Sequence, residues 1–244
     1  MKTLIQVVII MFLFSCVSER QVGQNPDVIT TTLPGTLRTM EIEFIKGKSF
    51  NHPSFAFWVE DLDGNYIETL FVTRYVATGK FGHGELEPGK WSNTSGEVRR
   101  PASLPYWSHK RGIVAPDGLY IPSPQTAVPD ALTGATPRGD FLLKTGTTVQ
   151  AAKKFRVLME INQAWDSNSY WVNSKFEGDR DYFTSLQPAL VYAVTVDLSG
   201  EDREFYLNPI GHSHPSGKDG KLYTDLSTFT TAREIAQKVV VRFK

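Results

Sequence analysis

Residues 55–73 read FAFWVEDLDGNYIETLFVT, two apolar and aromatic runs joined by a short polar segment. The runs Phe55–Asp61 and Tyr66–Thr73 are rich in aromatic and β-branched side chains, which favour strands. The segment between them, Leu62–Asn65, contains Asp-Gly, a dipeptide that marks a tight hairpin turn when it lies between two such runs. This stretch therefore predicts two neighbouring antiparallel strands.

The rest of the chain continues the same β pattern. Other runs with strand character are Glu41–Phe44, Lys154–Ile161, Leu190–Asp197, Glu204–Leu207 and Lys238–Phe243. Within the second of these runs, Phe155, Val157, Met159 and Ile161 alternate with other residues and would share one core-facing side. Thr231-x-x-Glu234 fits a capping box and predicts a short helical turn before the last strand. Many short strands and no long amphipathic helix predict an all-β, antiparallel sandwich over residues 39–244.

Residues 79–129 interrupt the strand pattern with seven of the 14 prolines of the chain. A span of this length without regular structure is often a lid or a binding loop. Its aromatic and basic side chains include Trp91, Tyr106, Trp107, His109, Arg99, Arg100, Lys110 and Arg111. Such residues could stack on an aromatic ligand and pair with its phosphate. Alternatively, the aromatic side chains pin a long loop to the sandwich, which is the commoner use of Trp in loops.

The N-terminus has the features of an export signal. Lys2 precedes the apolar run Leu4–Phe14, which is shorter than the roughly 20 residues of a membrane-spanning helix. The sequence Leu13–Cys16 is similar to a bacterial lipobox, in which cleavage leaves the Cys as the residue that receives lipid. We therefore expect a lipoprotein signal peptide at residues 1–15, lipid on Cys16 and a linker over residues 16–38. The protein would then be anchored on the periplasmic side of a bacterial membrane.

Charge and cysteine content restrict the partners and the compartment. The chain has 26 basic and 26 acidic residues, and no run of Lys or Arg forms the basic stripe that nucleic acid calls for. Nucleic acid is therefore not an expected partner. Cys16 is the single Cys, so no disulfide can form within the chain, and the absence of spare thiols suits an oxidising compartment.

The segment Asp130–Thr136 reads DALTGAT and has the character of an attachment site. A hydroxyl nucleophile that must enter the active site of another enzyme needs small neighbours and a bendable backbone, which Gly134 and Ala135 provide. Pro137 biases Thr136 toward extended or turn geometry, which presents a side chain outward. The same residue types also form plain surface turns, so a turn remains the alternative.

This segment resembles the motif D-x-x-(S/T)-G-A-(T/S) on which FAD:protein FMN transferases place a phosphoester-linked FMN. Such motifs occur in the FMN-carrying subunits of sodium-pumping NADH:quinone reductase and of Rnf complexes. The resemblance implies that FMN is the cofactor and that Thr136 is the attachment point. It also implies that Asp130, Thr133, Gly134 and Ala135 form the recognised site.

The hairpin at residues 55–73 resembles a family of predicted periplasmic proteins of unknown function, through its Val-Glu-Asp, Asp-Gly and Ile-x-Thr-Leu elements. The core of that family is similar to the immunoglobulin-like domain of the flagellar hook-capping protein. The resemblance runs from about Glu41 to the C-terminus. It implies an immunoglobulin/fibronectin-like β-sandwich with the 79–129 segment as a long loop insertion, and it implies no reaction.

Residues 211–220, GHSHPSGKDG, form a second candidate for chemistry. On an extended segment His212 and His214 would point the same way, which is a usable start for a metal site. The additional ligands would have to come from Asp219, Asp225, His83 or His109. The Ser, Gly, Pro and Asp-Gly content of the segment favours a hairpin loop over a metal site.

Two functions follow from these observations. In the first, the protein is a membrane-anchored electron carrier whose Thr136 receives FMN from a transferase and which exchanges electrons with membrane and periplasmic redox proteins. In the second, it is a non-catalytic immunoglobulin-like module that binds a protein, a glycan or a metal through its loops, and Asp130–Thr136 is a turn. No hydrolase or P-loop motif is found, so a redox carrier or a binding protein is favoured over an enzyme.

Overall fold

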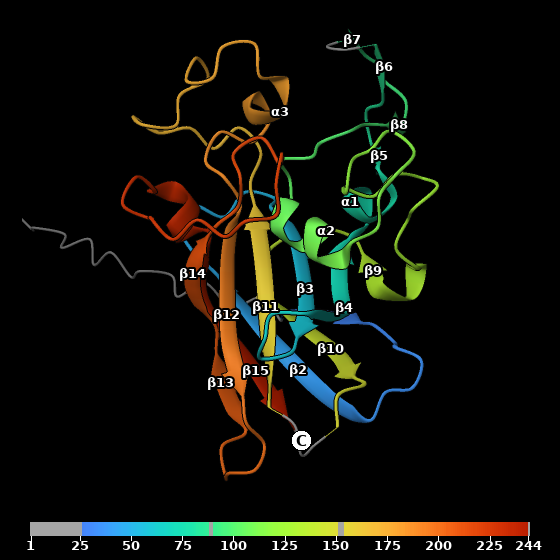
Figure 1. Cartoon of the computed structure of the whole chain (residues 1–244), viewed down its shortest axis with the longest axis vertical. Helices are drawn as coiled ribbons and strands as arrows, with labels where there is room; N and C mark the ends of the chain where they lie inside the picture. The colour runs from blue at the N-terminus through green and yellow to red at the C-terminus, as the bar shows by residue number, and fades with distance from the viewer. Residues whose placement is uncertain (1–25, 88–89, 151–153, 244) are drawn as a thin grey trace, which may run out of the picture.

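Two β-sheets pack face to face in the computed structural model, which describes residues 26–87, 90–150 and 154–243 (Figure 1). The predicted all-β sandwich is confirmed. The five-stranded sheet has the order β1-β10-β2-β15-β13. Its strands are β1 (Asp27–Thr30), β2 (Arg38–Lys46), β10 (Phe141–Thr147), β13 (Glu204–Tyr206) and β15 (Ala236–Phe243).

The six-stranded sheet has the order β14-β12-β11-β3-β4-β9. Its strands are β3 (Ser54–Glu60), β4 (Tyr66–Thr73), β9 (Thr133–Gly134), β11 (Phe155–Asn162), β12 (Leu190–Val196) and β14 (Asn208–His212). Both sheets are mixed and not purely antiparallel as expected, because β1 pairs parallel with β10 and β9 pairs parallel with β4. Both parallel pairs lie at a sheet edge.

The predicted hairpin is confirmed and joins β3 to β4. In its turn the carboxylate of Asp61 accepts hydrogen bonds from the backbone N–H and the side-chain amide of Asn65, both at 2.8 Å. Gly64 has a φ of 82°, a backbone conformation that favours glycine. Phe57 lies opposite Phe71 in the register of the two strands. The turn thus fixes the register that directs both aromatic rings into the core.

The main core lies between the two sheets. The predicted alternation along β11 is confirmed, because Phe155, Val157, Met159 and Ile161 all belong to this core. Phe44 of β2 packs against them from the other sheet and stacks on Phe141 at 5.0 Å between ring centroids. Aromatic rings therefore supply much of the apolar area that stabilises the sandwich.

A second core covers the opposite face of the six-stranded sheet. Helix α2 (Pro105–Arg111) supplies Tyr106 and Trp107, which pack with Trp58 of β3 and Leu158 of β11. Every residue of β3 is consequently buried. This arrangement explains why residues 55–59 are apolar on both faces and do not alternate.

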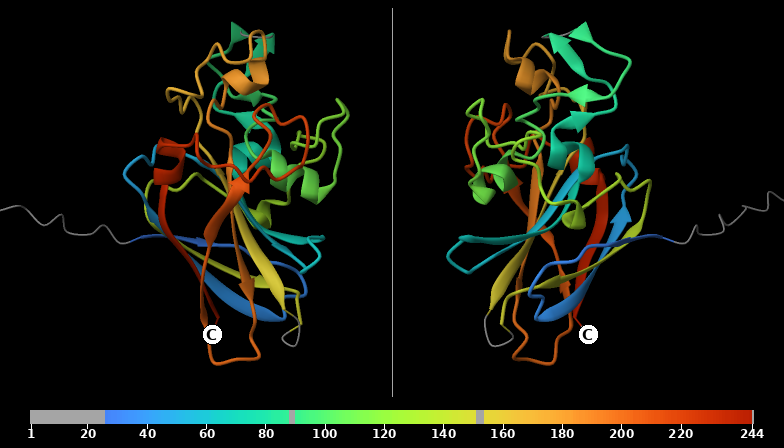
Figure 2. Two further views of the ribbon diagram at one scale, coloured as in Figure 1. Left: turned by 60° about the vertical axis from the view of Figure 1, so that its left-hand side comes forward. Right: turned by 90° about the vertical axis from the view of Figure 1, so that its right-hand side faces the viewer.

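The 79–129 insertion is more regular than its proline content predicts. Besides α2 it contains four short strands: β5 (Lys80–Phe81), β6 (Glu85–Glu87), β7 (Lys90–Trp91) and β8 (Gly96–Glu97). β5 pairs with β8 and β6 pairs with β7. These pairs extend beyond one end of the sandwich, and helix α3 (Arg180–Phe183) stands beside them at the same end (Figure 2). The sandwich therefore carries two excursions at a single end.

Three short helical elements complete the fold: α1 (Arg74–Thr78), η1 (Asp130–Leu132) and η2 (Thr231–Glu234). The helical turn expected before the last strand is η2, but the capping box is wrong. Thr230 is the N-cap and makes no side-chain cap, while the Thr231 hydroxyl donates to Asp166. Glu234 instead pairs with Lys48 at 2.8 Å.

The expected linker over residues 16–38 ends earlier than the sequence indicates, because Asp27–Thr30 already belongs to the five-stranded sheet as β1. The predicted signal peptide and the predicted lipidation site Cys16 lie outside the described residues. Within the described chain, none of the helices has the length and apolar character needed to cross a membrane.

Candidate functional site

The segment Asp130–Thr136 is folded around an edge strand. Its first three residues form η1, and Leu132 of this turn is buried in the second core. Thr133 and Gly134 then form β9, which pairs with Val72 and Thr73 of β4. The segment is therefore held against the sandwich up to Gly134, and the residues after Gly134 leave the sheet.

The two threonines of the segment lie in different environments. Thr133 is only 7% exposed, and its hydroxyl donates to the carbonyl oxygen of Asp130 at 3.1 Å. Thr136 is half-buried at the wall of a cavity, and no hydrogen bond joins its hydroxyl to another described residue. Thr136 is thus the threonine of the segment whose hydroxyl is available for reaction.

Gly134 has a packing role. A Cβ atom on Gly134 would lie 2.9 Å from the Phe71 ring and 3.6 Å from Ile29. A larger residue would push on the core, so the fold requires glycine here whether or not the segment is an attachment site. Asp130 and Ala135 are exposed.

A cavity of about 270 Å³ lies beside Thr136, at the end of the six-stranded sheet that carries the excursions. Five further segments contribute polar or aromatic groups to it. These groups are Ser54 of β3, Tyr75 of α1, Phe81 of β5, Asn162 of β11, and Arg100, which lies between β8 and α2. The structure therefore brings Thr136 next to one of the predicted insertion arginines.

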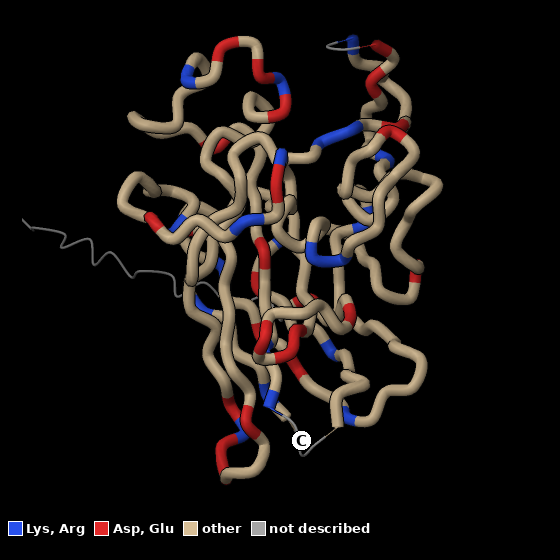
Figure 3. Tube along the Cα trace, in the orientation of Figure 1, with Lys and Arg blue, Asp and Glu red and all other residues tan. Residues whose placement is uncertain are grey.

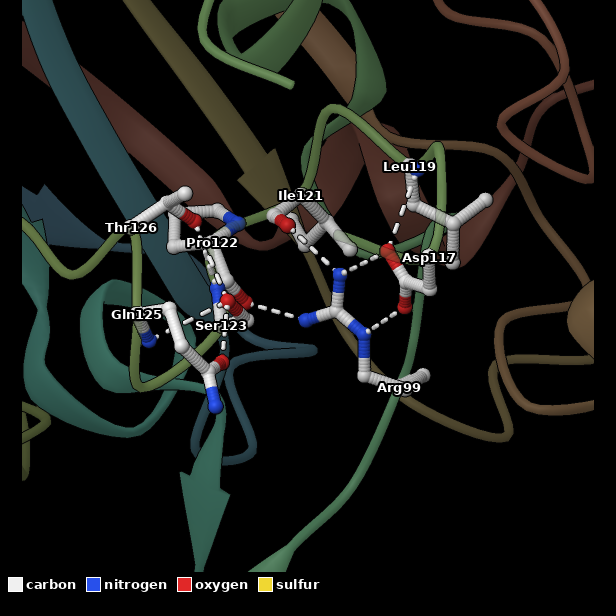
Figure 4. A network of polar contacts seen from close by, with 8 residues as sticks. All are labelled: Arg99, Asp117, Leu119, Ile121, Pro122, Ser123, Gln125 and Thr126. Atoms are coloured by element: carbon white, nitrogen blue, oxygen red, sulfur yellow. Dashed lines mark hydrogen bonds and ion pairs between the residues drawn. The ribbon is translucent and has the colours of Figure 1, made fainter. Parts of the chain in front are cut away.

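The neighbouring residue Arg99 has a purely structural role (Figure 4). Its guanidinium donates to both carboxylate oxygens of Asp117, at 2.6 and 3.1 Å. It also donates to the carbonyl oxygens of Ile121, at 2.9 Å, and Pro122. These bonds close the loop over residues 99–122 and leave Arg99 engaged on all sides.

Arg100 is oriented differently. Its guanidinium carbon lies 4.8 Å from the centre of the Phe81 ring and 5.6 Å from that of Trp91. Its Nε atom is buried and has no hydrogen-bond partner among the described residues. Burial lowers the pKa of Arg100 from its ordinary value. A guanidinium on aromatic faces with unused donors is suited to bind an anion.

Trp107 and Lys110 fasten the insertion to the sandwich, and Arg111 bonds within the insertion. Trp107 is fully buried, and its indole N–H donates to Thr69 at 3.0 Å. Lys110 donates to the carbonyl oxygen of Gly64 at 2.6 Å, and Arg111 donates to a backbone carbonyl at 2.8 Å. The interpretation of the aromatic side chains as loop anchors is therefore confirmed for Trp107.

A larger cavity of about 490 Å³ adjoins the first, because Arg100 and Thr184 line both. One wall is the β6–β7 strand pair with Trp91, and the other is α3 with Arg180. Lys or Arg and Asp or Glu occur together on both walls (Figure 3). An ion pair between Arg180 and Glu85, at 2.7 Å, joins the two walls.

The His-x-His pair has packing and loop contacts. His212 is buried between aromatic rings, and its Nδ1 lies 2.8 Å from the carbonyl oxygen of Ser213. Nδ1 of His214 accepts the backbone N–H of Ser216 at 3.0 Å. Burial lowers the pKa of both histidines. The described residues contain no group of three His, Cys, Asp or Glu side chains that could hold a metal ion, so within that part of the chain the pair lacks further ligands.

Three of the four other proposed ligands of that site are also engaged, and the fourth, His83, is exposed. The imidazole of His109 stacks on Tyr120 at 4.2 Å. The carboxylate of Asp219 accepts a hydrogen bond from Tyr223 at 3.0 Å, and that of Asp225 accepts the backbone N–H of Ser227 at 2.9 Å. These contacts are those of an ordered loop.

A buried carboxyl group under α2 is absent from the sequence-based predictions. Glu160 of β11 is fully buried and accepts the backbone N–H groups of Tyr106, at 3.1 Å, and Trp107, at 2.7 Å. Burial raises the pKa of Glu160 to about 8, against the opposing effect of these hydrogen bonds. The sequence signal is an acid inside the apolar run of β11, and the group joins α2 to the sheet.

Comparison of the chain with family models, with curated proteins and with solved structures returned no match. The two resemblances described above therefore remain predictions. What the site can do follows from its own geometry: among the described residues, a hydroxyl and a guanidinium Nε without hydrogen-bond partners lie with aromatic rings around two adjoining cavities.

Proposed function

We propose that the protein is a covalently flavinylated electron carrier, with FMN linked through its phosphate to the hydroxyl of Thr136. One observation carries the proposal: the unbonded Thr136 hydroxyl shares a cavity with Arg100, whose buried Nε has no partner among the described residues. The first residue supplies a nucleophile and the second supplies a cation for the phosphate formed there.

Attachment needs FAD as donor and a separate FMN transferase. Oγ of Thr136 attacks the phosphorus of the FMN half of FAD, the bond to the second phosphate breaks, and AMP leaves with that bridging oxygen. The hydroxyl proton passes to a base of the transferase. The product is a phosphodiester with one negative charge, which the guanidinium of Arg100 can bind in two parallel hydrogen bonds. No oxidation or reduction occurs in this step.

The fold assigns different tasks to the residues around Thr136. β9 and η1 fix the backbone before Thr136, so the hydroxyl is presented at a defined place. Phe81 and Tyr75, with ring centroids 5.0 Å apart, form an aromatic wall that keeps water from one side of the cavity. Once attached, FMN supplies reversible one- and two-electron transfer, and the protein shields and orients it.

The proposal includes the location inferred from the N-terminus. With lipid on Cys16, the carrier would be held at the periplasmic surface of a membrane, where membrane and periplasmic redox proteins meet it. Covalent attachment suits this setting because a dissociable cofactor would be lost from an exported protein.

The test is expression of the full chain in a bacterial periplasm with and without an FMN transferase. We expect the intact mass to rise by one FMN less one water, and the protein band to fluoresce, only when the transferase is present. Thr136→Ala should lose both signals. Thr133→Ser is the matched control and should keep them, because serine also satisfies the motif and keeps a hydroxyl that can donate to the Asp130 carbonyl oxygen. An unchanged wild-type mass, or FMN retained on Thr136→Ala, would refute the proposal.

A further inference from the structure

We propose that the 490 Å³ cavity between the β6–β7 strand pair and α3 receives the ring system of the flavin, with Trp91 against the ring face and Arg100 between ring and phosphate. This inference rests on the proposed function and extends it. It assigns a binding site for a flat, tricyclic aromatic ligand to residues that the attachment segment does not include.

The sizes of the cavities lead to this assignment. The cavity beside Thr136 holds about 270 Å³, which is below the roughly 300–1,000 Å³ of ordinary ligand sites. A whole FMN would therefore not be enclosed there. The adjoining cavity holds about 490 Å³, and the two share Arg100 and Thr184 in their walls. A ligand anchored at Thr136 has room to continue past Arg100 into the larger space.

The walls of the larger cavity match the chemistry of an isoalloxazine ring. Such a ring has two apolar faces and, along one edge, carbonyl oxygens and an N–H group. Trp91 and Leu86 offer apolar area, and they are 44% and 69% exposed. The guanidinium groups of Arg100 and Arg180 can donate to the carbonyl oxygens. Asp181 provides a carboxylate to accept the N–H.

The exposure of the Trp91 indole supports the proposal that a flavin ring binds against it. Trp91 and Phe81 flank the Arg100 guanidinium, at 5.6 and 4.8 Å. The indole is therefore held next to the shared wall of the two cavities while much of it faces solvent. A planar ligand stacked on it would bury this apolar area at little entropic cost, since the indole is already positioned.

The ion pair between Arg180 and Glu85 sets the width of the site. It links α3 to β6 at 2.7 Å. The two chain segments that form the walls of the cavity are therefore held together by this ion pair. The ring would enter between walls that are already joined, and ring binding requires no new chain contact. Pre-organisation of this kind favours binding.

Flavin fluorescence measured on the flavinylated full chain tests the proposal, because an indole stacked on the flavin ring quenches its emission. We expect weak emission from the wild type and a severalfold increase in Trp91→Leu. Trp165→Leu is the control, since Trp165 is also an exposed indole, at 50%, but packs on Phe183 and does not line either cavity. Its emission should equal that of the wild type.

Iodide quenching gives a second measurement that does not depend on a variant. A ring inside the cavity should be several times less accessible to iodide in the folded protein than in the same flavinylated protein unfolded in urea. Equal iodide access in both states, or equal emission from wild type and Trp91→Leu at equal FMN content, would overturn the ring site and leave attachment at Thr136 standing. If the intact mass shows no FMN on the wild type, the proposed function fails and the ring site fails with it.

Discussion

Two consecutive arginines show how neighbours in sequence can serve different purposes. Arg99 satisfies the carbonyl oxygens of Ile121 and Pro122 and pairs with Asp117. Arg100 contacts aromatic rings and keeps its buried Nε unpaired among the described residues. A buried, unpaired donor lowers stability by roughly 1–3 kcal/mol. Its presence is therefore understandable if a ligand supplies the missing partner.

This difference predicts stability effects of different size for the same substitution. Arg99→Met removes four hydrogen bonds and should lower the free energy of unfolding by about 2–4 kcal/mol. Arg100→Met keeps an unbranched side chain on the Phe81 and Trp91 rings. It should change the free energy of unfolding by about 1 kcal/mol or less. Urea unfolding of the protein without FMN measures both. A large loss in Arg100→Met would mean that Arg100 is structural.

At the level of elements, β9 combines an edge strand with the candidate attachment segment. Its two residues pair with the end of β4, and Gly134 leaves the space that the Phe71 ring occupies. The strand is short because the chain must turn away immediately afterward to bring Thr136 to the cavity. Glycine here is therefore explained by packing, in addition to any part in recognition by a transferase.

Gly134→Ala should destabilise the protein by about 1–3 kcal/mol, the usual effect of overpacking a core. Gly139→Ala is the matched control, because a Cβ there would make ordinary contacts, at 3.6 Å and beyond, with the Lys46 side chain. We expect that control to be neutral or slightly stabilising, since alanine restricts the unfolded chain. Thermal unfolding of both variants measures the two effects. Equal midpoint temperatures would show that the ring of Phe71 moves aside freely.

The elements that the sequence predicts are those with a local signal. Asp-Gly between aromatic runs identifies β3 and β4, and the alternation of residues 155–161 identifies the core face of β11. The parallel edge strands carry no such signal: β1 is four residues long, and its partner β10 lies far along the chain. Proline content hides the four strands of the insertion, because prolines at loop positions do not prevent short pairings between them.

The candidate site is only partly predictable for the same reason. The attachment segment points to Thr136 through its residue order alone. Arg100 is one of six Lys and Arg residues in the insertion, and nothing local separates it from Arg99. Ser54, Tyr75, Asn162 and Thr184 reach the cavities from distant segments, so their role depends on the strand order.

At the scale of the whole molecule, a buried carboxyl group joins the second core to the six-stranded sheet. Glu160 holds the first turn of α2 through the N–H groups of Tyr106 and Trp107. Burial raises its pKa from 4.5 to about 8, so the folded state binds a proton that the unfolded state releases between these values. The stability that this protonated carboxyl adds to the folded state is fully present below pH 4.5 and is lost as the pH rises through about 8.

Glu160→Gln removes this titration. The stability of the wild type relative to the variant should therefore fall as the pH rises between these two values, by up to about 1.4 kcal/mol per pH unit. Urea unfolding of both proteins at several pH values gives the difference at each pH. The glutamine amide of the variant cannot accept both N–H groups, which lowers the variant's free energy of unfolding by the same amount at every pH. This constant difference does not change how the stability difference depends on pH. A pH-independent difference would show that Glu160 is ionised in the folded protein.

The strand order of the five-stranded sheet also determines when the chain can fold. β2 lies between β10 and β15, and Phe44 pairs in register with Phe141 and Val239. The β3–β4 hairpin can close as soon as it is synthesised, whereas β2 must wait for the last strand of the chain. Until then the apolar side of β2 lacks its cover, and closing such long loops slows folding. The five-stranded sheet can therefore be completed only after β15 has left the ribosome, so the β3–β4 hairpin exists before the sheet that covers it.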